Sequence, residues 1–467
     1  MPTAPSASES CTPVPQANSP ASAKVGRAPQ RARSAVSSAC GAASKGRRRY
    51  TTRLRRKRAK PTGRSEEETA ASSREALLPS WRTRATEERL LSVMRVALVH
   101  DWLVGRRGGE AVLEALVRLF PGAEIFTLLH RPGSVGGPIE TRPIHVSPLQ
   151  HVPGVFRHYR NLLPLMPWAV RQLDVRGFDL VLSTSHCVAK GVLVPAGTPH
   201  LAYVFAPMRY MWDLFEEYFG PGRAAWPVRL AARAVRPRLQ AWDRATAAAP
   251  DVMLADSQHV AARIARAWGR SVEVVYPPVD VERFASGALG TGAGGYFLWV
   301  GALAPYKRLD VALEAFRRLG APLWVAGDGP DAVRLRAALP SNVRWLGAVS
   351  DAELPGLYRG ARALVFPGEE DFGIVPLEAM ASGRPVLALG RGGAVETVTA
   401  ETGLFFDEAT AEALVEAVHR FEVVEGEFRP EAARARALAF GPAQFAAGIR
   451  RALEPLLGRA SVVDGRV

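Results

Sequence analysis

From Met94 onward the chain alternates short apolar runs with longer amphipathic patterns, and this alternation constrains its fold more than any other feature. Apolar runs typical of buried strands occupy residues 94–100, 178–183 and 252–255, whereas residues 108–119 carry apolar side chains at helical spacing. Short strands separated by helices predict parallel βαβ units. We therefore predict an α/β fold with two doubly wound, Rossmann-like domains that face a cleft.

A glycine-rich segment, residues 286–295, divides this alternation into two series. Its small residues offer no side chains to pack, so we predict a flexible linker. The predicted domains are residues 94–285 and residues 296–442. An amphipathic helix within residues 443–467 is expected to cross back to the first domain.

The net charge of +15 is concentrated in the first 93 residues. Residues 1–93 hold 19 Lys and Arg against 7 Asp and Glu, whereas the remainder holds 41 against 38. This tail is rich in Ala, Ser, Pro and Arg and is predicted to be disordered. It is interpreted as a mis-called start or a dispensable tail; the alternative is a segment that binds an anionic membrane or nucleic acid. For the predicted domains, no specific nucleic-acid partner is expected.

Cysteine content and hydropathy bear on location and cofactors. Cys187 is the single cysteine after residue 93, which excludes a disulfide framework there and suits a reducing cytoplasm. No run approaches 18 consecutive apolar residues, so no membrane-spanning helix is predicted. No Cys/His group has zinc spacing, and no metal site is predicted.

The stretch VFPGEEDFGIVPLEAMASG, residues 365–383, combines a strand end, an acidic loop and a predicted helix start near Val375. The first N–H groups of such a helix suit a phosphate. Glu370 and Glu378 are separated by seven residues and could accept hydroxyl groups of a sugar nucleotide. The alternative is a solvated loop charge together with a helix-dipole partner.

Three further groups of candidate residues follow predicted strands. Gly108 and Gly109 would let backbone N–H groups approach an anion. Lys307 and Arg308 could neutralise a diphosphate. His186 could act as an acid or base or bind a substrate hydroxyl. The alternatives are turn glycines, solvated surface charges and a structural histidine.

These residues resemble a known family. EEDFGIVPLEAMASGRPVLA resembles the signature of family 4 retaining glycosyltransferases, which have the GT-B fold. VGALAPYKRLDVALEAF, VAGDGP, VRWLGAVSDAEL and LADSQHVAARI are similar to its other landmarks, in the same order. HDWL and YVFAPMRYMWD resemble a bacterial branch that builds surface polysaccharide, often with mannose from GDP-mannose. The resemblance covers residues 94–457.

The resemblance implies roles for individual residues. Glu378 would hold the ribose hydroxyls, Glu370 the donor sugar's hydroxyls, and Lys307 the diphosphate, with Gly109 beside it. The donor site would be completed by backbone N–H groups of four residues: Phe372, Gly373, Ile374 and Val375. A nucleotide-sugar donor, expected to be GDP-mannose, and a glycan or polyprenyl-linked acceptor follow from the family, and no metal is required.

Two positions depart from the family. Ala302 stands where the family usually has an arginine, and Arg308 is the candidate to compensate. Phe205 stands where a histidine is often found, and His186 is the candidate to replace it. These departures leave open a weakened sugar-nucleotide binder, and a sugar-nucleotide epimerase of the same fold is a further alternative.

The acceptor side is less specific. Residues 206–213 are dense in groups that bind sugars, or they form a packed corner of the core. Residues 156–170 and 226–242 mix arginines with apolar residues and could rest on an anionic membrane, or they are ordinary amphipathic helices. We expect a cytoplasmic transferase at the inner face of the plasma membrane.

Overall fold

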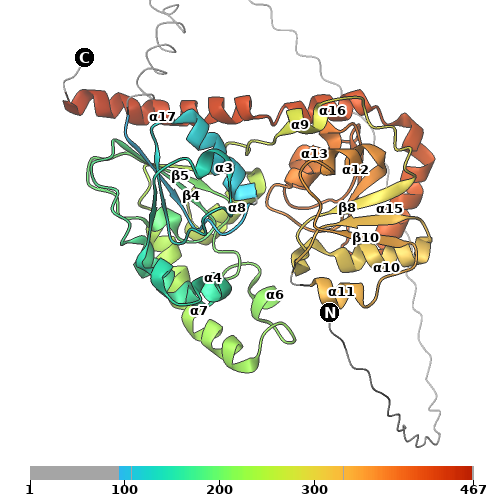
Figure 1. Ribbon diagram of the computed structural model, residues 1–467, viewed down its shortest axis with the longest axis horizontal. Coiled ribbons are helices and arrows are strands. Elements are labelled where there is room, and N and C mark those ends of the chain that lie inside the picture. Colours follow the sequence, from blue (N-terminus) through green and yellow to red (C-terminus); the bar gives the residue numbers. More distant parts are fainter. Residues whose placement is uncertain (1–93, 107, 330, 465–467) are drawn as a thin grey trace, which may run out of the picture. The chain divides into compact units, whose positions relative to one another are not determined.

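The computed structural model describes residues 94–464 except 107 and 330 (Figure 1). The tail, residues 1–93, lies outside the described residues, and so do the predictions of its disorder and its binding. The described residues all fall within one compact unit of the chain. We call residues 94–275 the first lobe and residues 279–440 the second lobe.

The first lobe contains a sheet of seven parallel strands. Their order is β3 (Ile144–Val146), β2 (Glu124–Thr127), β1 (Val96–His100), β4 (Leu180–Ser185), β5 (His200–Val204), β6 (Val252–Ala255) and β7 (Glu273–Val274). Its helices are α3 (Gly108–Leu119), α4 (Val155–His158), α5 (Met166–Val170), α6 (Phe215–Phe219), α7 (Trp226–Thr246) and α8 (Gln258–Trp268). Short 3-10 turns are η1 (Gly137–Ile139), η2 (Pro148–His151), η3 (Tyr159–Leu165) and η4 (Ala189–Gly191).

The second lobe contains a sheet of six parallel strands. Their order is β10 (Val343–Gly347), β9 (Leu323–Ala326), β8 (Tyr296–Val300), β11 (Ala361–Phe366), β12 (Val386–Leu389) and β13 (Gly403–Phe406). Its helices are α9 (Val281–Ala285), α10 (Leu309–Leu319), α11 (Ala332–Arg336), α12 (Leu354–Gly360), α13 (Ile374–Ala381), α14 (Ala394–Thr397), α15 (Ala411–Val424) and α16 (Pro430–Leu438), with 3-10 turns η5 (Pro305–Lys307) and η6 (Glu425–Glu427). The last helix, α17, runs from Pro442 to Asp464.

Both sheets are buried on two faces, which explains their continuous apolar strands. All five residues of β1 are buried, and so are all four of β12. One apolar cluster of the first sheet includes Leu98 and the other includes Val99, so alternate residues of β1 serve opposite faces. The predicted α/β fold with two doubly wound sheets is confirmed.

The strand orders place one topological switch point in each lobe. In the first sheet the chain moves outward from β1 to β3, then returns to β4 on the other side of β1. In the second sheet it moves from β8 to β10, then returns to β11 beside β8. In doubly wound sheets, ligands bind beyond the carboxyl ends of the strands at such points.

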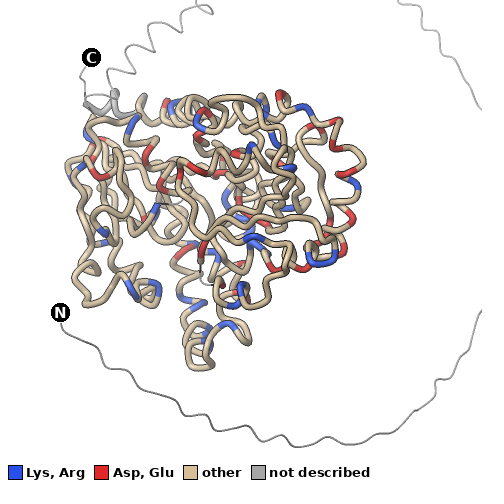
Figure 2. Tube along the Cα trace, turned by 45° about the vertical axis from the view of Figure 1, so that its right-hand side comes forward, with Lys and Arg blue, Asp and Glu red and all other residues tan. Residues whose placement is uncertain are grey.

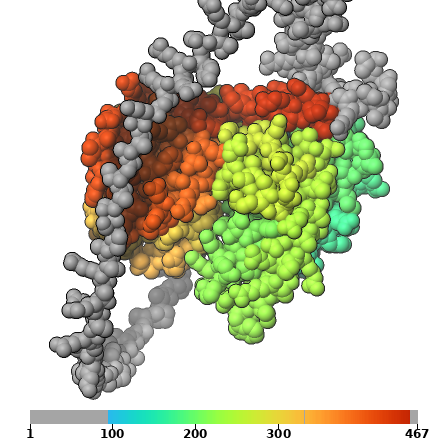
Figure 3. Space-filling view, turned by 180° about the vertical axis from the view of Figure 1, so that it is seen from behind, coloured from blue at the N-terminus to red at the C-terminus, as the bar shows by residue number. Residues whose placement is uncertain are grey.

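Helix α17 packs against the first lobe. Phe445, Ile449 and Leu453 belong to the same buried cluster as Leu98 of β1. A Cβ atom at Gly448 would lie 2.7 Å from a side-chain carbon of Val275, so the helix runs close to the end of the first lobe. The red surface of α17 lies on the green and yellow surface of this lobe in Figure 3.

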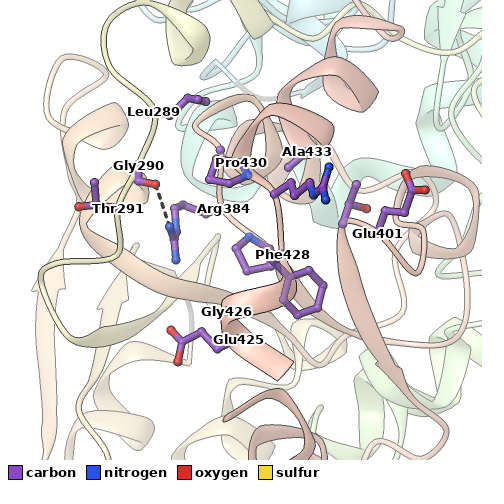
Figure 4. Close-up of a pocket in the computed structure, with 14 residues that line it drawn as sticks. Leu289, Gly290, Thr291, Arg384, Glu401, Glu425, Gly426, Phe428, Pro430 and Ala433 are labelled. Carbon is purple, nitrogen blue, oxygen red and sulfur yellow. Dashed lines mark hydrogen bonds between the residues drawn. The ribbon is translucent and has the colours of Figure 1, made fainter. Parts of the chain in front are cut away.

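The glycine-rich segment differs from the predicted flexible linker. Its backbone is tied to the second lobe: Gly290 N donates to Ser382 O at 3.0 Å, and Arg384 Nη1 donates to Gly290 O at 2.8 Å (Figure 4). A Cβ at Gly290 would lie 2.8 Å from that Ser382 oxygen, so glycine permits the close approach. The segment packs through backbone groups, which apolar content does not reveal.

The chain crosses between the lobes earlier than residue 285. Val275 belongs to a first-lobe cluster, and Val279, Val281 and Phe284 belong to a second-lobe cluster. The crossing therefore lies in residues 276–278, and α9 is part of the second lobe. This placement differs from the predicted boundary at residue 285.

The described trace carries interspersed charges of both signs (Figure 2). In the part of the chain that the structure describes, no helix is long and apolar enough to cross a membrane. Within the same residues, no group of three or more His, Cys, Asp or Glu is arranged to hold a metal ion.

Candidate active site

The switch point of the second sheet brings Lys307 and Glu370 together. Lys307 ends η5, just after β8, and Glu370 lies in the loop between β11 and α13, residues 367–373, which we call the acidic loop. Lys307 Nζ donates to Glu370 Oε1 at 2.5 Å, and both side chains are largely buried. Burial alone would lower the pKa of Lys307, but the Glu370 carboxylate outweighs it and raises the pKa. The lysine is therefore held as a cation.

Glycines brace the acidic loop on two sides. A Cβ at Gly368 would lie 2.7 Å from Lys307 Cα, so the loop can approach η5 only without a side chain there. On the other side, Gly393 N donates to Glu370 O at 2.9 Å. A Cβ at Gly393 would lie 2.6 Å from Asp371 O. The glycines at 392 and 393 were not singled out from the sequence, because a GG pair alone does not indicate what it packs against.

Glu378 lies inside α13, eight residues after Glu370. Tyr358 Oη donates to Glu378 Oε2 at 2.7 Å. Burial raises the pKa of Glu378 to about 7, although the Tyr358 hydrogen bond and the nearby Arg283 lower it. A partly buried carboxyl that is easily deprotonated near neutral pH suits hydroxyl binding, because the anion accepts two or more hydrogen bonds.

The start of α13 offers backbone N–H groups. The helix begins at Ile374, preceded by Gly373 with φ 88°, and Pro376 is its third residue rather than its first. No described side chain caps this end, so the first N–H groups of the helix, at Ile374 and Val375, have no partner inside it. Phe372 is buried in the core of the second lobe and fixes the loop that leads into the helix.

Helix α3 of the first lobe meets the start of α13. A Cβ at Gly108 would lie 2.9 Å from Ile374 Cδ1. A Cβ at Gly109 would contact the rings of Phe205 and His100 at 3.5 and 3.6 Å. Two helix N-termini, each with a partial positive charge, therefore lie close together. Of the two glycines, Gly108 lies at this contact, whereas Gly109 faces residues of its own lobe.

His186 lies at the switch point of the first sheet, directly after β4. Its Nδ1 lies 3.1 Å from Asp101 Oδ2, and Asp101 follows β1. The Asp101 carboxylate also accepts four backbone hydrogen bonds at 2.7–2.9 Å, from residues 186–189. This arrangement assigns the Nδ1 proton to the aspartate side and leaves Nε2 for another partner.

The surroundings of His186 favour its neutral form. Burial lowers the pKa of His186 more than the Asp101 carboxylate raises it. The side chain is still 27% exposed. Its ring lies 6.4 Å from the ring of Phe205 and 4.5 Å from that of Trp102, measured between centroids. His186 therefore lies near Phe205, the position at which the family often has the histidine that His186 is predicted to replace.

Arg308 does not join the other cations. It has φ 50°, the single positive φ among described residues other than glycine, and its guanidinium pairs with Asp310 at 3.2 Å. The side chain is 38% exposed. Arg308 thus contacts a neighbouring carboxylate, and its compensation for Ala302 stays a prediction.

Other interactions join the lobes at the acidic loop and were not predicted. Arg209 and Arg263 of the first lobe both pair with Asp371, which follows Glu370. Ser257 Oγ donates to Asp371 O at 2.6 Å. The N–H groups of residues 258 and 259, at the start of α8, donate to the Glu396 carboxylate at 2.8 Å each. The paired residues lie more than 100 positions apart in the chain, so local sequence patterns could not predict these contacts.

The segment 206–213 serves two purposes. Trp212 Nε1 donates to the buried Asp243 at 2.8 Å, so this part of the segment belongs to the core. Arg209 instead reaches the acidic loop.

A cavity of about 400 Å³ lies elsewhere in the second lobe (Figure 4). Its lining includes Gly290, Thr291, Arg384 and Thr402, which precede strands β8, β12 and β13. Because all strands are parallel, this is the edge opposite the acidic loop. The cavity is therefore separate from the candidate site.

Comparisons with known proteins bear on this site. Residues 294–421 match the family model described as "Glycosyl transferases group 1". The chain is 30% identical over 331 residues to a GDP-mannose-dependent alpha-mannosyltransferase of Mycolicibacterium smegmatis, an alignment that covers 67% of this chain and 84% of the relative. It is 32% identical over 198 residues to a GDP-mannose-dependent alpha-(1-6)-phosphatidylinositol monomannoside mannosyltransferase of Mycobacterium tuberculosis, covering 36% of this chain and 51% of that protein.

Solved structures share the fold at low identity. Sucrose-phosphate synthase from Thermosynechococcus elongatus aligns with a TM-score of 0.58 and 18% identity, covering 78% of this chain and 99% of that one. Anabaena HepE in complex with UDP and glucose aligns with a TM-score of 0.54 and 18% identity, covering 77% and 99%. These likenesses extend over both lobes and show the architecture.

Proposed function

The chain belongs to the group 1 glycosyltransferases, family 4 of the retaining enzymes with the GT-B fold, and from this premise we propose that it transfers mannose from GDP-mannose to a glycan or polyprenyl-linked acceptor. The observation that carries the proposal is the Lys307–Glu370 pair at the switch point of the second sheet, with Glu378 on the helix that follows the acidic loop. Relatives whose names specify GDP-mannose support the choice of donor. An O-antigen chain mannosyltransferase of Escherichia coli, 31% identical over 138 residues, supports a role in surface polysaccharide synthesis.

The leaving group requires positive charge. Breaking the bond between the sugar and the diphosphate places negative charge on the phosphate oxygens. Lys307 is held as a cation next to the acidic loop, and the N-termini of α3 and α13 lie against each other. Fixed positive charge of this kind stabilises the developing anion more than it stabilises the substrate. The proposal assigns these groups to the diphosphate and gives no role to a metal.

Two carboxylates would orient the donor. Glu378, with Tyr358 on one oxygen, would accept hydrogen bonds from the ribose hydroxyls. Glu370 would bind hydroxyls of the mannose through the oxygen that does not face Lys307. The N–H groups of residues 372–375 would complete the contacts to sugar and phosphate. The acidic loop thus fixes the sugar relative to the lysine.

The acceptor would approach from the first lobe. In a retaining transfer, the acceptor hydroxyl approaches on the face that the diphosphate leaves, and a phosphate oxygen takes its proton. His186, with Nδ1 directed to Asp101, would use Nε2 to hold a hydroxyl at the reacting centre. Phe205 at 6.4 Å would exclude water from the same space.

Peripheral membrane binding forms part of the proposal. Trp226 and Leu230 of α7 are 73% and 62% exposed, and Trp168 of α5 is 52% exposed. Arginines at positions 229 and 233 lie on the same helix as the first two. Exposed tryptophans with arginines suit an anionic lipid surface. We therefore propose that the reaction takes place at the cytoplasmic face of the plasma membrane, near a lipid-linked acceptor.

The first experiment identifies the donor. Thermal shifts are measured with GDP-, UDP- and ADP-sugars, followed by transfer assays with the nucleotide sugar that stabilises the protein most. GDP-mannose is expected to give the largest shift, and Glu378→Ala should abolish both the shift and transfer without unfolding the protein. Wild-type transfer by Glu378→Ala would overturn the site assignment.

The same assay separates the alternatives. Conversion of the donor without any acceptor would indicate an epimerase. Binding without transfer to glycan or polyprenyl-linked acceptors would indicate a weakened binder.

Sedimentation with anionic vesicles, compared between wild type and a Trp226→Ser/Leu230→Ser variant, tests membrane binding: equal sedimentation of both would contradict it. A protein that begins at Met94 should keep its transfer activity.

A further inference from the structure

Arg209 of the first lobe pairs with Asp371 in the acidic loop of the proposed donor site. The diphosphate of a nucleotide sugar carries two negative charges, and the described residues place Lys307 next to the acidic loop with Ala302 nearby in sequence and Arg308 directed to Asp310. A second cation would have to come from another element.

Arg209 lies at this point. It follows β5 in the first lobe, and its guanidinium carbon lies 5.6 Å from the ring centre of Tyr306, the residue immediately before Lys307. Its Nη2 pairs with Asp371, the residue immediately after Glu370. Arg209 therefore contacts both segments that supply the Lys307–Glu370 pair.

The charge of Arg209 affects titratable groups in both lobes. Among weaker contributions, it lowers the pKa of Lys307 and the pKa of His186, which requires that it lie within electrostatic reach of each. Its side chain is 23% exposed, so one part is packed and another part is accessible. Arg209 is therefore near both the lysine proposed to meet the leaving group and the histidine proposed to meet the acceptor.

Asp371 does not depend on Arg209 alone. Arg263 also pairs with it, and Arg263 is only 6% exposed and is held in turn by Asp213 at 2.5 Å. If Arg209 turned to bind another anion, Asp371 would still be paired with Arg263. The cost of exchange is therefore smaller than that of separating an isolated buried ion pair.

We propose that Arg209 is the second diphosphate-binding cation of this enzyme: when the donor binds, its guanidinium turns from Asp371 to the phosphate oxygens, while Arg263 retains Asp371. This inference rests on the proposed function. An arginine suits the task because its planar guanidinium can donate two parallel hydrogen bonds to phosphate. It would also link the first lobe to the donor, since the arginine belongs to the loop after β5.

The competing interpretation is a fixed contact that only joins the lobes. The two interpretations differ in the effect of Asp371→Asn. If Arg209 binds phosphate, removing the carboxylate charge releases the guanidinium and should preserve or increase diphosphate affinity. If the pair only joins the lobes, Asp371→Asn, which also removes the partner of Arg263, should weaken GDP binding at least as much as Arg209→Gln does.

The test is calorimetric titration of the full chain with GDP and with GMP, or with UDP and UMP if the donor panel favours uridine. Arg209→Gln should weaken GDP binding by about 10- to 100-fold, the range of a charge-assisted hydrogen bond, with GMP binding nearly unchanged. Arg209→Lys keeps the charge and should recover part of the loss. Asp371→Asn should bind GDP at least as tightly as the wild type.

Three outcomes would decide against the proposal. Equal GDP affinity of Arg209→Gln and wild type would overturn it, and so would a loss of GDP affinity in Asp371→Asn as large as that in Arg209→Gln or larger. If Arg209→Gln is not folded by thermal melting, equal GDP and GMP losses in the folded Arg209→Lys variant would overturn it as well. Failure of the wild type to bind any nucleoside diphosphate would overturn the proposed function itself, which distinguishes the two failures.

Discussion

The phenolic hydroxyl of Tyr358 donates a 2.7 Å hydrogen bond to one carboxylate oxygen of Glu378. The pair lies within the second lobe, where burial raises the pKa of Glu378 to about 7. A carboxylate accepts hydroxyl hydrogen bonds on both oxygens only when ionised. The site is therefore expected to change its donor affinity within the physiological pH range.

Donor affinity should rise with pH through neutrality. Below about pH 7 the Glu378 carboxyl is increasingly protonated, and each further unit of acidification reduces the ionised fraction about tenfold. Affinity for GDP-mannose should follow this fraction and level off above neutrality. Calorimetric titration across neutral pH measures the profile. Glu378→Gln should bind weakly with little pH dependence, and an unchanged profile in that variant would show that another group titrates.

The stability of the unliganded protein should change in the opposite direction. The folded-state pKa of Glu378 lies above the ordinary glutamate value of 4.5, so the folded protein binds this proton more tightly than the unfolded chain does. Its contribution to stability is fully present below about pH 4.5 and is lost as the pH rises through about 7. Partial exposure limits the loss to at most roughly 3 kcal/mol.

Urea denaturation at mildly acidic and mildly alkaline pH tests this dependence. Glu378→Gln should remove most of the difference between the two conditions. The part of the pH dependence that Glu378→Gln removes should be a loss of stability from acidic to alkaline pH. If that part is instead a gain in the free energy of unfolding, the assigned direction is wrong.

Removal of Lys307 should affect catalysis more than binding of the nucleoside. Lys307→Ala removes the cation paired with Glu370 and is expected to lower kcat/KM about 100- to 1,000-fold, as with other groups that stabilise a developing anion. Arg308→Gln is the matched control, because its exposed guanidinium pairs with Asp310. Steady-state kinetics with the identified donor measure both, and similar losses in the two variants would argue against a specific role for Lys307.

Local sequence patterns predicted much of the fold. The range of α3, residues 108–119, agrees with the pattern of apolar residues, and so does that of β6, residues 252–255. Strand β7 was missed because it is only two residues long and one of them is a glutamate, so no apolar run marks it. A sheet edge of this kind depends on pairing with a neighbour, which periodicity cannot show.

The candidate site was predicted only where its residues are close in sequence. Glu370 and Glu378 lie on one loop and helix, so their spacing was visible. Asp101 and the N–H groups of residues 186–189 are 85 or more positions apart, and Arg209 and Asp371 are 162 apart. Such partners are set by strand order: β1 lies beside β4 only because the chain reverses direction across the sheet.

Asp101 should be essential for the local structure around His186. Its carboxylate accepts four backbone hydrogen bonds. Asp101→Asn replaces one acceptor oxygen with a donor, so at least one buried N–H loses its partner and faces another donor. We expect a loss of about 2–4 kcal/mol in the free energy of unfolding, from unsatisfied buried groups. Asp174→Asn, at an exposed turn, should leave the melting temperature nearly unchanged.

His186 itself should matter for transfer and little for folding. His186→Asn keeps a polar group next to Asp101 but loses the ring nitrogen at Nε2. A fall in kcat of about 100-fold or more is expected from loss of a positioned hydroxyl partner, with a melting temperature close to that of the wild type. Wild-type kcat in this variant would show that His186 does not take over the role of the histidine that the family often has at position 205.

Gly393 should control the acidic loop through space rather than backbone conformation. Its φ of −69° is accessible to any residue, but a Cβ there would lie 2.6 Å from Asp371 O. Gly393→Ala must therefore displace the loop that carries Glu370, at a cost of about 1–3 kcal/mol in stability, typical of overpacking. Donor affinity should fall as well, because Glu370 and the start of α13 move together.

Gly356→Ala is the matched control: this exposed glycine of α12 has open space around its Cβ position, so alanine should be neutral or slightly stabilising. If Gly393→Ala changes melting temperature and donor affinity no more than Gly356→Ala does, the loop does not depend on this glycine.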